Sequence, residues 1–246
     1  MKTVETRNGT LIIGSREEIF EVKAEQIRAA ATTTERDFAA IGLTGGSTPK
    51  AWYPWAVEKG VFSKEDLAKI VWLTSDERTV PMTHDDNNFG HAARGMLDPL
   101  GVRHTHRLPF ASDMPPSDGA VKFNADFKRV FGEGSFDICI LGMGDDCHCA
   151  SIFPGSDLIG KGDTLAELAT ADNVPSRGWR LTATEWGIGQ SRAILQIVTG
   201  ANKAEALKTV LEGELDPKQY PSQMLAQWSE KVTIIADEAA CSALSI

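Results

Sequence analysis

Residues 136–155 read FDICILGMGDDCHCASIFPG and join an apolar run to a glycine-rich polar turn. The run, Phe136–Leu141, is a short apolar segment of the kind that lies inside a parallel sheet. Small and acidic residues follow it at once, with His148 among them. Open α/β sheets bind ligands at the carboxyl ends of their parallel strands, so this stretch predicts both a fold and the place of a site.

Two other apolar runs end in the same way, because TGGSTP follows Phe38–Leu43 and SDER follows Ile70–Thr74. We also predict strands at Thr10–Ile13, Ala193–Thr199 and Val232–Ala236, and helices at Arg16–Thr33, Trp52–Glu58, Asn87–Met96, Asp118–Val130, Lys203–Glu212 and from Asp237 onward. This alternation predicts an α/β fold with a single domain over residues 1–246, in which helices cover both faces of a largely parallel, doubly wound sheet. One crevice should then hold all three polar segments.

The composition argues against several classes of protein. The net charge of −9 disfavours a nucleic-acid partner, since phosphate backbones select clustered Lys and Arg, but it permits a small anionic substrate in a locally basic cleft. No apolar run approaches the roughly 20 residues that span a bilayer, and the N-terminus lacks the apolar core of a signal peptide. We therefore expect a cytoplasmic protein with no membrane contact, either a monomer or a homodimer.

The glycine-rich loop is a candidate anion site. Gly45 and Gly46 permit positive φ and close backbone approach. Ser47 and Thr48 add hydroxyls where a helix with unpaired N–H groups begins. The spacing matches neither a P-loop nor a dinucleotide fingerprint, and an ordinary capped strand-to-helix turn could use the same residues.

The charged triplet Asp76-Glu77-Arg78 follows the second strand end. Arginine favours bidentate contacts with phosphate or carboxylate, and one Asp could orient a base or a sugar hydroxyl. A solvated charged turn is the alternative. The place of the triplet at the predicted crevice favours a functional role.

His148, preceded by Asp145 and Asp146, is the candidate acid–base group. Histidine can accept a proton from water near neutral pH, and a neighbouring carboxylate can fix its tautomer. We expect residues 148–152 to begin a helix whose N–H groups face developing negative charge. A helix-capping Asp beside a packed His is the alternative.

Cys147 and Cys149 flank this His and raise two further possibilities. Three consecutive residues cannot readily converge on one ion, and no Cys-x-x-Cys or second ligand cluster is present, so we expect no metal or cofactor. A thiol nucleophile would need its own His partner, for which there is no signature. Packing is the remaining interpretation of the two thiols.

Five segments together resemble one known family. They are GLTGGSTPK, SDERTVPMTHDDNNFG, LGMGDDCHCASIFPGS, RLTATEWGIG and VTGANKAEAL, in this order over residues 42 to 207. They are similar to the motifs of the glucosamine-6-phosphate isomerase/6-phosphogluconolactonase family, and to its lactonases in particular. The resemblance implies a NagB/RpiA/CoA-transferase-like α/β fold. It also implies metal-free hydrolysis of 6-phosphoglucono-δ-lactone to 6-phosphogluconate, in the oxidative pentose phosphate pathway.

The resemblance also implies roles at the matching positions. His148 would activate the attacking water, Asp76 would lie beside the sugar ring, and Asp146 would support the site. Residues that would surround the phosphate or balance its charge are Gly45, Gly46, Ser47, Thr48, Arg78, Arg180 and Lys203.

The related deaminases are the main alternative, because they share the glycine-rich loop and the G-x-D-G-H turn. Their pattern continues I-A-F-N-E-P, and Phe153 stands where that acid would be, so the sequence favours the lactonases. Cys147 and Cys149 replace the family's Gly and Thr. If that Gly serves a positive φ, the Cys costs about 1 kcal/mol or more. A protein that binds phosphosugars without turnover therefore stays a third hypothesis.

Overall fold

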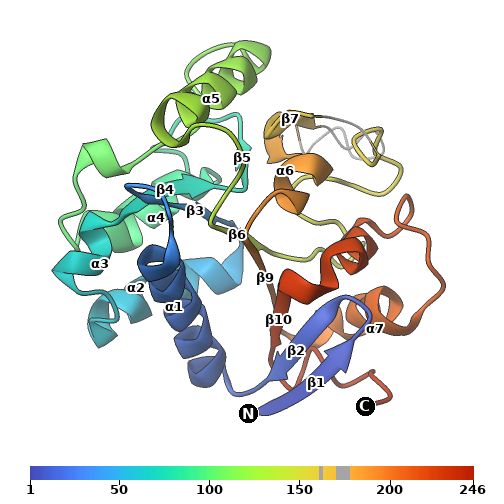
Figure 1. The fold of residues 1–246 in the computed structure, drawn as a ribbon. Helices are drawn as coiled ribbons and strands as arrows, with labels where there is room; N and C mark the ends of the chain where they lie inside the picture. The colour runs from blue at the N-terminus through green and yellow to red at the C-terminus, as the bar shows by residue number, and fades with distance from the viewer. Residues whose placement is uncertain (161–162, 170–177) are drawn as a thin grey trace.

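A seven-stranded sheet organises the computed structural model, which describes residues 1–160, 163–169 and 178–246 (Figure 1). The strand order is β1-β2-β10-β9-β6-β3-β4, and only the β1–β2 pair is antiparallel. These strands are β1 (Lys2–Thr6), β2 (Gly9–Ile13), β3 (Ala39–Leu43), β4 (Ile70–Thr74), β6 (Ile138–Leu141), β9 (Ala193–Val198) and β10 (Val232–Ala236). The prediction of a largely parallel α/β sheet is confirmed.

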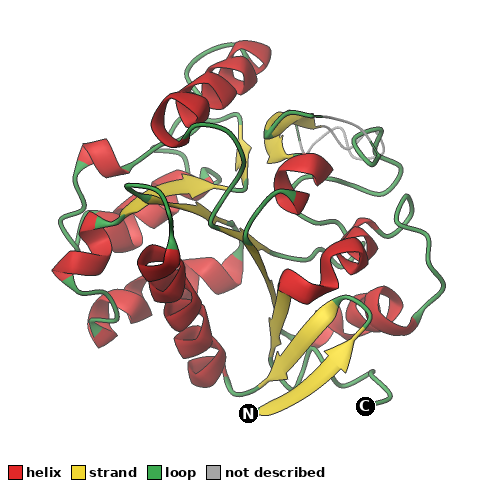
Figure 2. Cartoon of the chain, in the orientation of Figure 1, coloured by secondary structure: helices red, strands yellow, loops and turns green. Residues whose placement is uncertain are grey.

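Helices cover both faces of this sheet (Figure 2). They are α1 (Arg16–Thr33), α2 (Ser47–Lys59), α3 (Lys64–Ala68), α4 (Asn88–Ala92), α5 (Pro116–Phe131), α6 (Glu185–Gly189) and α7 (Ala204–Glu212). Ser15 caps the N-terminus of α1 and forms a reciprocal capping box with Glu18. A π-helical turn, Ala93–Leu97, continues α4, and a 3₁₀ segment, Pro221–Lys231, precedes β10.

The alternation of side chains along each central strand builds two cores. In β6, Ile138 and Ile140 join the cluster that contains residues of α1, α2 and α4. The residues between them, Cys139 and Leu141, join the cluster on the other face, with residues of α5, α6 and α7. Because successive strand residues point to opposite faces, a strand covered on both sides is apolar throughout, as its sequence is.

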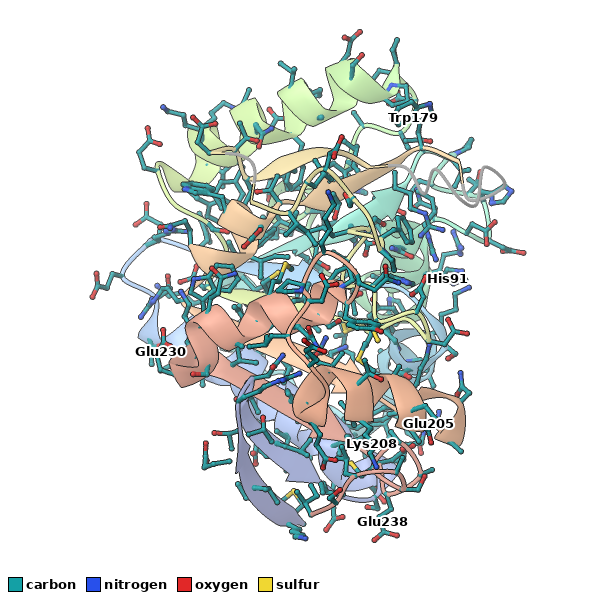
Figure 3. The ribbon with its side chains drawn as sticks, turned by 90° about the vertical axis from the view of Figure 1, so that its right-hand side faces the viewer. His91, Trp179, Glu205, Lys208, Glu230 and Glu238 are labelled. Atoms are coloured by element: carbon teal, nitrogen blue, oxygen red, sulfur yellow. The ribbon has the colours of Figure 1, made fainter. Side chains whose placement is uncertain are left out.

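The helix α7 is amphipathic. In α7 the buried positions are Ala204, Ala206, Leu207, Val210 and Leu211. Figure 3 shows Glu205 and Lys208 of this helix on its outer side. Among the described residues, no helix has the length and apolar character needed to cross a bilayer.

A second, three-stranded antiparallel sheet was not predicted from the sequence. It has the order β5 (Asp76–Arg78), β8 (Arg180–Ala183) and β7 (Ala166–Ala169). Ser75 connects it to the large sheet, because its N–H donates to Leu43 O (2.6 Å) and its carbonyl accepts from Ala183 N (2.6 Å). This connection places the charged triplet at the carboxyl edge of the large sheet.

The prediction of a C-terminal helix from Asp237 was wrong. Residues 237–246 form turns that follow β10. Both carboxylate oxygens of Asp237 accept the N–H of Gly200 at 3.0 Å, and Oδ1 also accepts from Ala240 N at 2.8 Å. The acid therefore ties this turn to the end of β9 instead of capping a continuing helix.

Candidate functional site

A cavity of about 230 Å³ opens at the carboxyl edge of the large sheet, around the ends of β3, β6 and β9. Strand order reverses between β3 and β6, so this is the switch point where ligands of open α/β sheets bind. Its lining residues are Thr44, Gly45, Gly46, Ser47, Thr48, Pro49, Asp76, Arg78, Asn88, Gly142, Met143, Gly144, His148, Ala150, Arg180, Ile197, Thr199, Asn202 and Lys203.

The structure brings the predicted site residues together. Those in the cavity lining are Gly45, Gly46, Ser47, Thr48, Asp76, Arg78, His148, Arg180 and Lys203. Asp146 is not part of the lining, but it is hydrogen-bonded to the lining residue His148. Trp179, next to Arg180 in the chain, is outside the cavity lining and is 53% exposed at the surface (Figure 3).

His148 and Asp146 form a hydrogen-bonded pair. Asp146 Oδ1 lies 2.5 Å from His148 Nδ1 and also accepts the backbone N–H of His148 at 3.1 Å. The carboxylate therefore orients the imidazole and places its proton on Nδ1. Nε2 has no hydrogen-bond partner in the described part of the chain, so it is the ring nitrogen that can exchange a proton in the cavity.

The turn that carries His148 is not the beginning of a helix, so that prediction was wrong. Cys147 and Ala150 have φ of 66° and 51°, which a right-handed helix cannot contain. Isolated bridges instead join Cys149 to Met143 and to Ile152. The positive φ at Cys147 confirms the conformation that the family's Gly suggested.

Asp76 is 5% exposed and is held from two sides. Its Oδ2 accepts the hydroxyl of Ser151 at 2.7 Å, and its Oδ1 accepts Nδ2 of Asn88 at 3.5 Å. The carboxylate reaches the cavity from β5, at the edge of the small sheet. A partly desolvated, hydrogen-bonded carboxylate of this kind can orient a ligand hydroxyl.

Its neighbour Glu77 has a structural role. Glu77 is 1% exposed and accepts the backbone N–H groups of Arg78, Asn88 and Phe89, each at 2.7 Å. Burial raises the pKa of this carboxyl to about 7, against the three N–H groups, which lower it. Of the two acids in the triplet, only Asp76 lines the cavity.

The glycine-rich loop leads into α2, whose N-terminus faces the cavity. Gly46, at φ 107°, is the N-cap, and no side chain caps the helix. The first N–H groups of α2 are thus left without a side-chain cap at the cavity, and the N-terminus of a helix favours a bound anion. Thr48 Oγ1 lies 2.5 Å from Thr199 Oγ1, which joins this loop to the end of β9.

Three cationic side chains make the cavity basic in a protein of net charge −9. Arg78 and Arg180 are cross-strand partners on β5 and β8, and Lys203 lies just before α7. The Arg180 guanidinium stands 5.6 Å from the ring centroid of Phe153. Such a cleft attracts an anionic ligand despite the overall charge.

The cysteines offer no activated thiol among the described residues. Burial raises the pKa of Cys147 to about 11, and burial also raises the pKa of Cys149 above its ordinary value. A thiol is nucleophilic only when deprotonated, so both are inert near neutral pH. In the described ranges, no group of three or more His, Cys, Asp or Glu side chains is placed to hold a metal ion.

Sequence reasoning did not assign Ser151 and Thr199 to the site, and it left Asn88 open between a part of this site and a helix cap. Asn88 lay in the HDDNN stretch beside the triplet, where it could equally have been a cap. Ser151 and Thr199 gave no local signal, since only tertiary contacts bring them to Asp76 and Thr48.

Comparison with known proteins gives the family. A family model described as glucosamine-6-phosphate isomerases/6-phosphogluconolactonase matches residues 15–234. The chain belongs to this family. A 6-phosphogluconolactonase of Synechocystis sp. is 32% identical over 218 residues, which are 86% of this chain and 88% of that protein. One of Nostoc sp. is 33% identical over 213 residues, with 84% and 85% covered.

The fold of this family member also matches solved structures. A 6-phosphogluconolactonase from Trypanosoma cruzi superposes with a TM-score of 0.82 at 23% identity, over 96% of this chain and 97% of that chain. At such identity the likeness shows the fold alone. Because the family name covers both isomerases and lactonases, the site must separate the two chemistries.

Proposed function

We propose that this protein hydrolyses 6-phospho-D-glucono-1,5-lactone to 6-phosphogluconate, in the oxidative pentose phosphate pathway. The observation that carries the proposal is the His148–Asp146 pair in one cavity with Arg78, Arg180, Lys203 and the N-terminus of α2. The His–Asp pair can transfer protons, and the cationic groups with the helix N-terminus can bind a phosphate. The names of the relatives agree with this activity.

The mechanism follows from the groups present. Nε2 of His148 takes a proton from water as the water oxygen bonds to the lactone carbonyl carbon. Asp146 stabilises the imidazolium through Nδ1. The imidazolium then returns the proton to the ring oxygen as the C–O bond breaks, which yields a free hydroxyl and a carboxylic acid, and the acid releases its remaining proton to solvent to become the carboxylate. Asp76 orients a hydroxyl of the sugar, and the cationic groups hold the phosphate.

Phe153 favours this chemistry over deamination. Its ring centroid lies 4.9 Å from that of His148, and the side chain is 2% exposed. A phenyl ring cannot transfer a proton, so the acid that the deaminases would use for ring opening is missing at this position. Lactone hydrolysis needs only a water activator, charge stabilisation and substrate positioning.

The wider assignment belongs to the same proposal. We infer one phosphosugar lactonase domain over residues 1–246 that acts in the cytoplasm on a small phosphorylated lactone. It would need no metal or organic cofactor and no nucleic-acid or membrane partner. We infer that it is a monomer or a homodimer.

A coupled assay on freshly prepared 6-phosphogluconolactone tests the activity, with glucosamine 6-phosphate in parallel. We expect lactone hydrolysis well above the spontaneous rate and no ammonia from the amino sugar. Ammonia release would establish the deaminase alternative. Tight binding of 6-phosphogluconate without turnover would establish the non-catalytic one.

A matched pair of variants tests the acid–base assignment. Asp145 and Asp146 are adjacent, but only Asp146 bonds His148. Asp146→Asn should lower kcat by about 100-fold or more, because the imidazolium loses its stabilising charge. Asp145→Asn should leave kcat within about twofold. His148→Ala should abolish turnover and keep product affinity. Equal effects of the two Asp variants would contradict this assignment.

A further inference from the structure

Asn88 is in contact with three separate parts of the site. It is the first residue of α4 and is 2% exposed, yet it lines the cavity. Its backbone N–H donates to Glu77 Oε1 at 2.7 Å, which fixes the start of the helix. Because this bond holds the backbone of Asn88 in place, the side-chain amide has a fixed position in the cavity wall.

The amide connects Asp76 to Arg78. Nδ2 of Asn88 donates to the backbone carbonyl of Asp76 at 3.0 Å and reaches its Oδ1 at 3.5 Å. Oδ1 of Asn88 accepts from Nη1 of Arg78. An amide has a donor end and an acceptor end, so it can serve a carboxylate and a guanidinium at once.

The same amide also lies against the glycine-rich loop. A Cβ at Gly45 would stand 1.9 Å from Asn88 Oδ1, so this position has no room for any side chain. Gly45 is thus explained by close packing and not by its backbone angle. The packing sets the distance between the loop that leads into α2 and the β5 edge.

The two residues that Asn88 connects carry opposite charges and lie on the same strand. Asp76 and Arg78 are two residues apart on β5, so both side chains lie on the same face. Left alone, they would attract each other and form an ion pair. Among the described residues, Arg78 instead bonds Asn88 Oδ1 and Asp86 O (3.0 Å), and Asp76 bonds Asn88 and Ser151.

We propose that Asn88 is a positioning residue that keeps Asp76 and Arg78 apart. By bonding both, its amide prevents their neutralisation, so the carboxylate stays available to a sugar hydroxyl and the guanidinium to the phosphate. This inference rests on the proposed lactonase function. It adds a determinant of specificity, because Asn88 controls how strongly Arg78 binds the phosphate group of the substrate.

The test compares two substrates. Asn88→Ala removes the bridging amide, and Asn88→Asp keeps its shape but replaces the donor end with a second acceptor. For both variants we expect the ratio of kcat/KM for 6-phosphogluconolactone to that for unphosphorylated glucono-1,5-lactone to fall by about 10- to 100-fold, the worth of one charge-assisted hydrogen bond. KM for the phosphorylated lactone should rise more than kcat falls.

Asn87→Asp is the matched control. Asn87 lies outside the cavity lining and caps α4 by accepting from Gly90 N at 2.7 Å, as an Asp can. Its Nδ2 donates to Val80 O at 3.0 Å, so this change removes one amide donor, as Asn88→Asp does, but away from the cavity. This variant should keep the substrate ratio of the parent. If both Asn88 variants fold, by circular dichroism and thermal unfolding, and lose equal activity on the two lactones, Asn88 is only structural and the inference fails. An inactive parent protein would overturn the proposed function instead.

Discussion

Cys147 holds a backbone conformation that L-residues seldom adopt, beside the proposed catalytic His. Its φ is 66°, and its carbonyl accepts the N–H of Ser222 at 2.9 Å. The side chain is 3% exposed, with Sγ 3.6 Å from the carbonyl of Ala206. The turn is thus kept by its surroundings although the residue is not Gly, which shows how the family's motif tolerates the replacement.

The strain at this position can be measured with two variants. Cys147→Gly and Cys147→Ala both delete the thiol, so their difference isolates the backbone. We expect the Gly variant to be more stable than the Ala variant by about 1 kcal/mol in urea unfolding, because Gly accepts positive φ without a steric cost. The same pair at Cys241, which has no positive φ, should favour Ala or show no difference. Equal stability of the two Cys147 variants would mean that the turn relaxes.

At the scale of elements, the short strand β5 and the start of α4 are joined by one carboxylate. Glu77 accepts three backbone N–H groups, two of which belong to Asn88 and Phe89 at the N-terminus of α4. Glu77 thus satisfies free N–H groups at the start of α4 as a helix cap would, although it belongs to the strand β5. It also sets the position of Asn88 and, through it, of Asp76 and Arg78.

Glu77→Gln should therefore destabilise the protein. Its amide end would face at least one backbone donor that the carboxylate now accepts, which costs about 1–3 kcal/mol. The measurement is urea unfolding at pH 8, above the pKa of about 7, where the carboxyl is ionised. The exposed Glu25→Gln on α1 serves as the control and should change stability by less than about 0.5 kcal/mol. A loss no larger than that of the control would show that the three contacts are replaceable.

An element could be predicted from the sequence where its own residues identify it, and could not where it forms only through tertiary contacts. The central strands, such as Ile70–Thr74, were predicted because an apolar run needs no partner to be recognised. The strand Asp76–Arg78 was not, since its three charged residues become a strand only by pairing with β8. The helix expected at 148–152 failed because positive φ at Cys147 and Ala150 leaves no trace in composition. His148 and Asp146 were predictable as a pair because they are neighbours in the chain.

In the part of the chain that the structure describes, the candidate functional groups lie at one edge of the sheet, and a buried cation without a hydrogen-bond partner lies elsewhere. Lys23 of α1 is 1% exposed, and its Nζ has no hydrogen-bond partner among the described residues. The ammonium lies 3.8 Å from the ring centroid of Trp52 and 5.6 Å from that of Tyr53, both on α2. Burial lowers the pKa of Lys23 from 10.5 to about 7.

This burial makes global stability depend on pH with a definite sign. Between about pH 7 and 10.5 the unfolded chain carries a proton on Lys23 that the folded protein has released. The free energy of unfolding therefore rises with pH in this window, with a slope of up to about 1.4 kcal/mol per pH unit from this group. Below about pH 7 the folded state must bury the charge, and the slope vanishes.

Lys23→Met removes the titration and keeps the shape. We expect it to exceed the parent in stability at pH 7, because an uncompensated buried ammonium is replaced by an apolar chain of similar length. Its advantage should shrink as the pH rises toward 10, since the parent gains stability there and the variant does not. Comparing the two proteins at each pH cancels the effect of the growing net negative charge. Lys64→Met, at an exposed position on α3, should give a curve parallel to that of the parent. A parallel curve for Lys23→Met would show that the cation–π contacts, and not a released proton, accommodate this lysine.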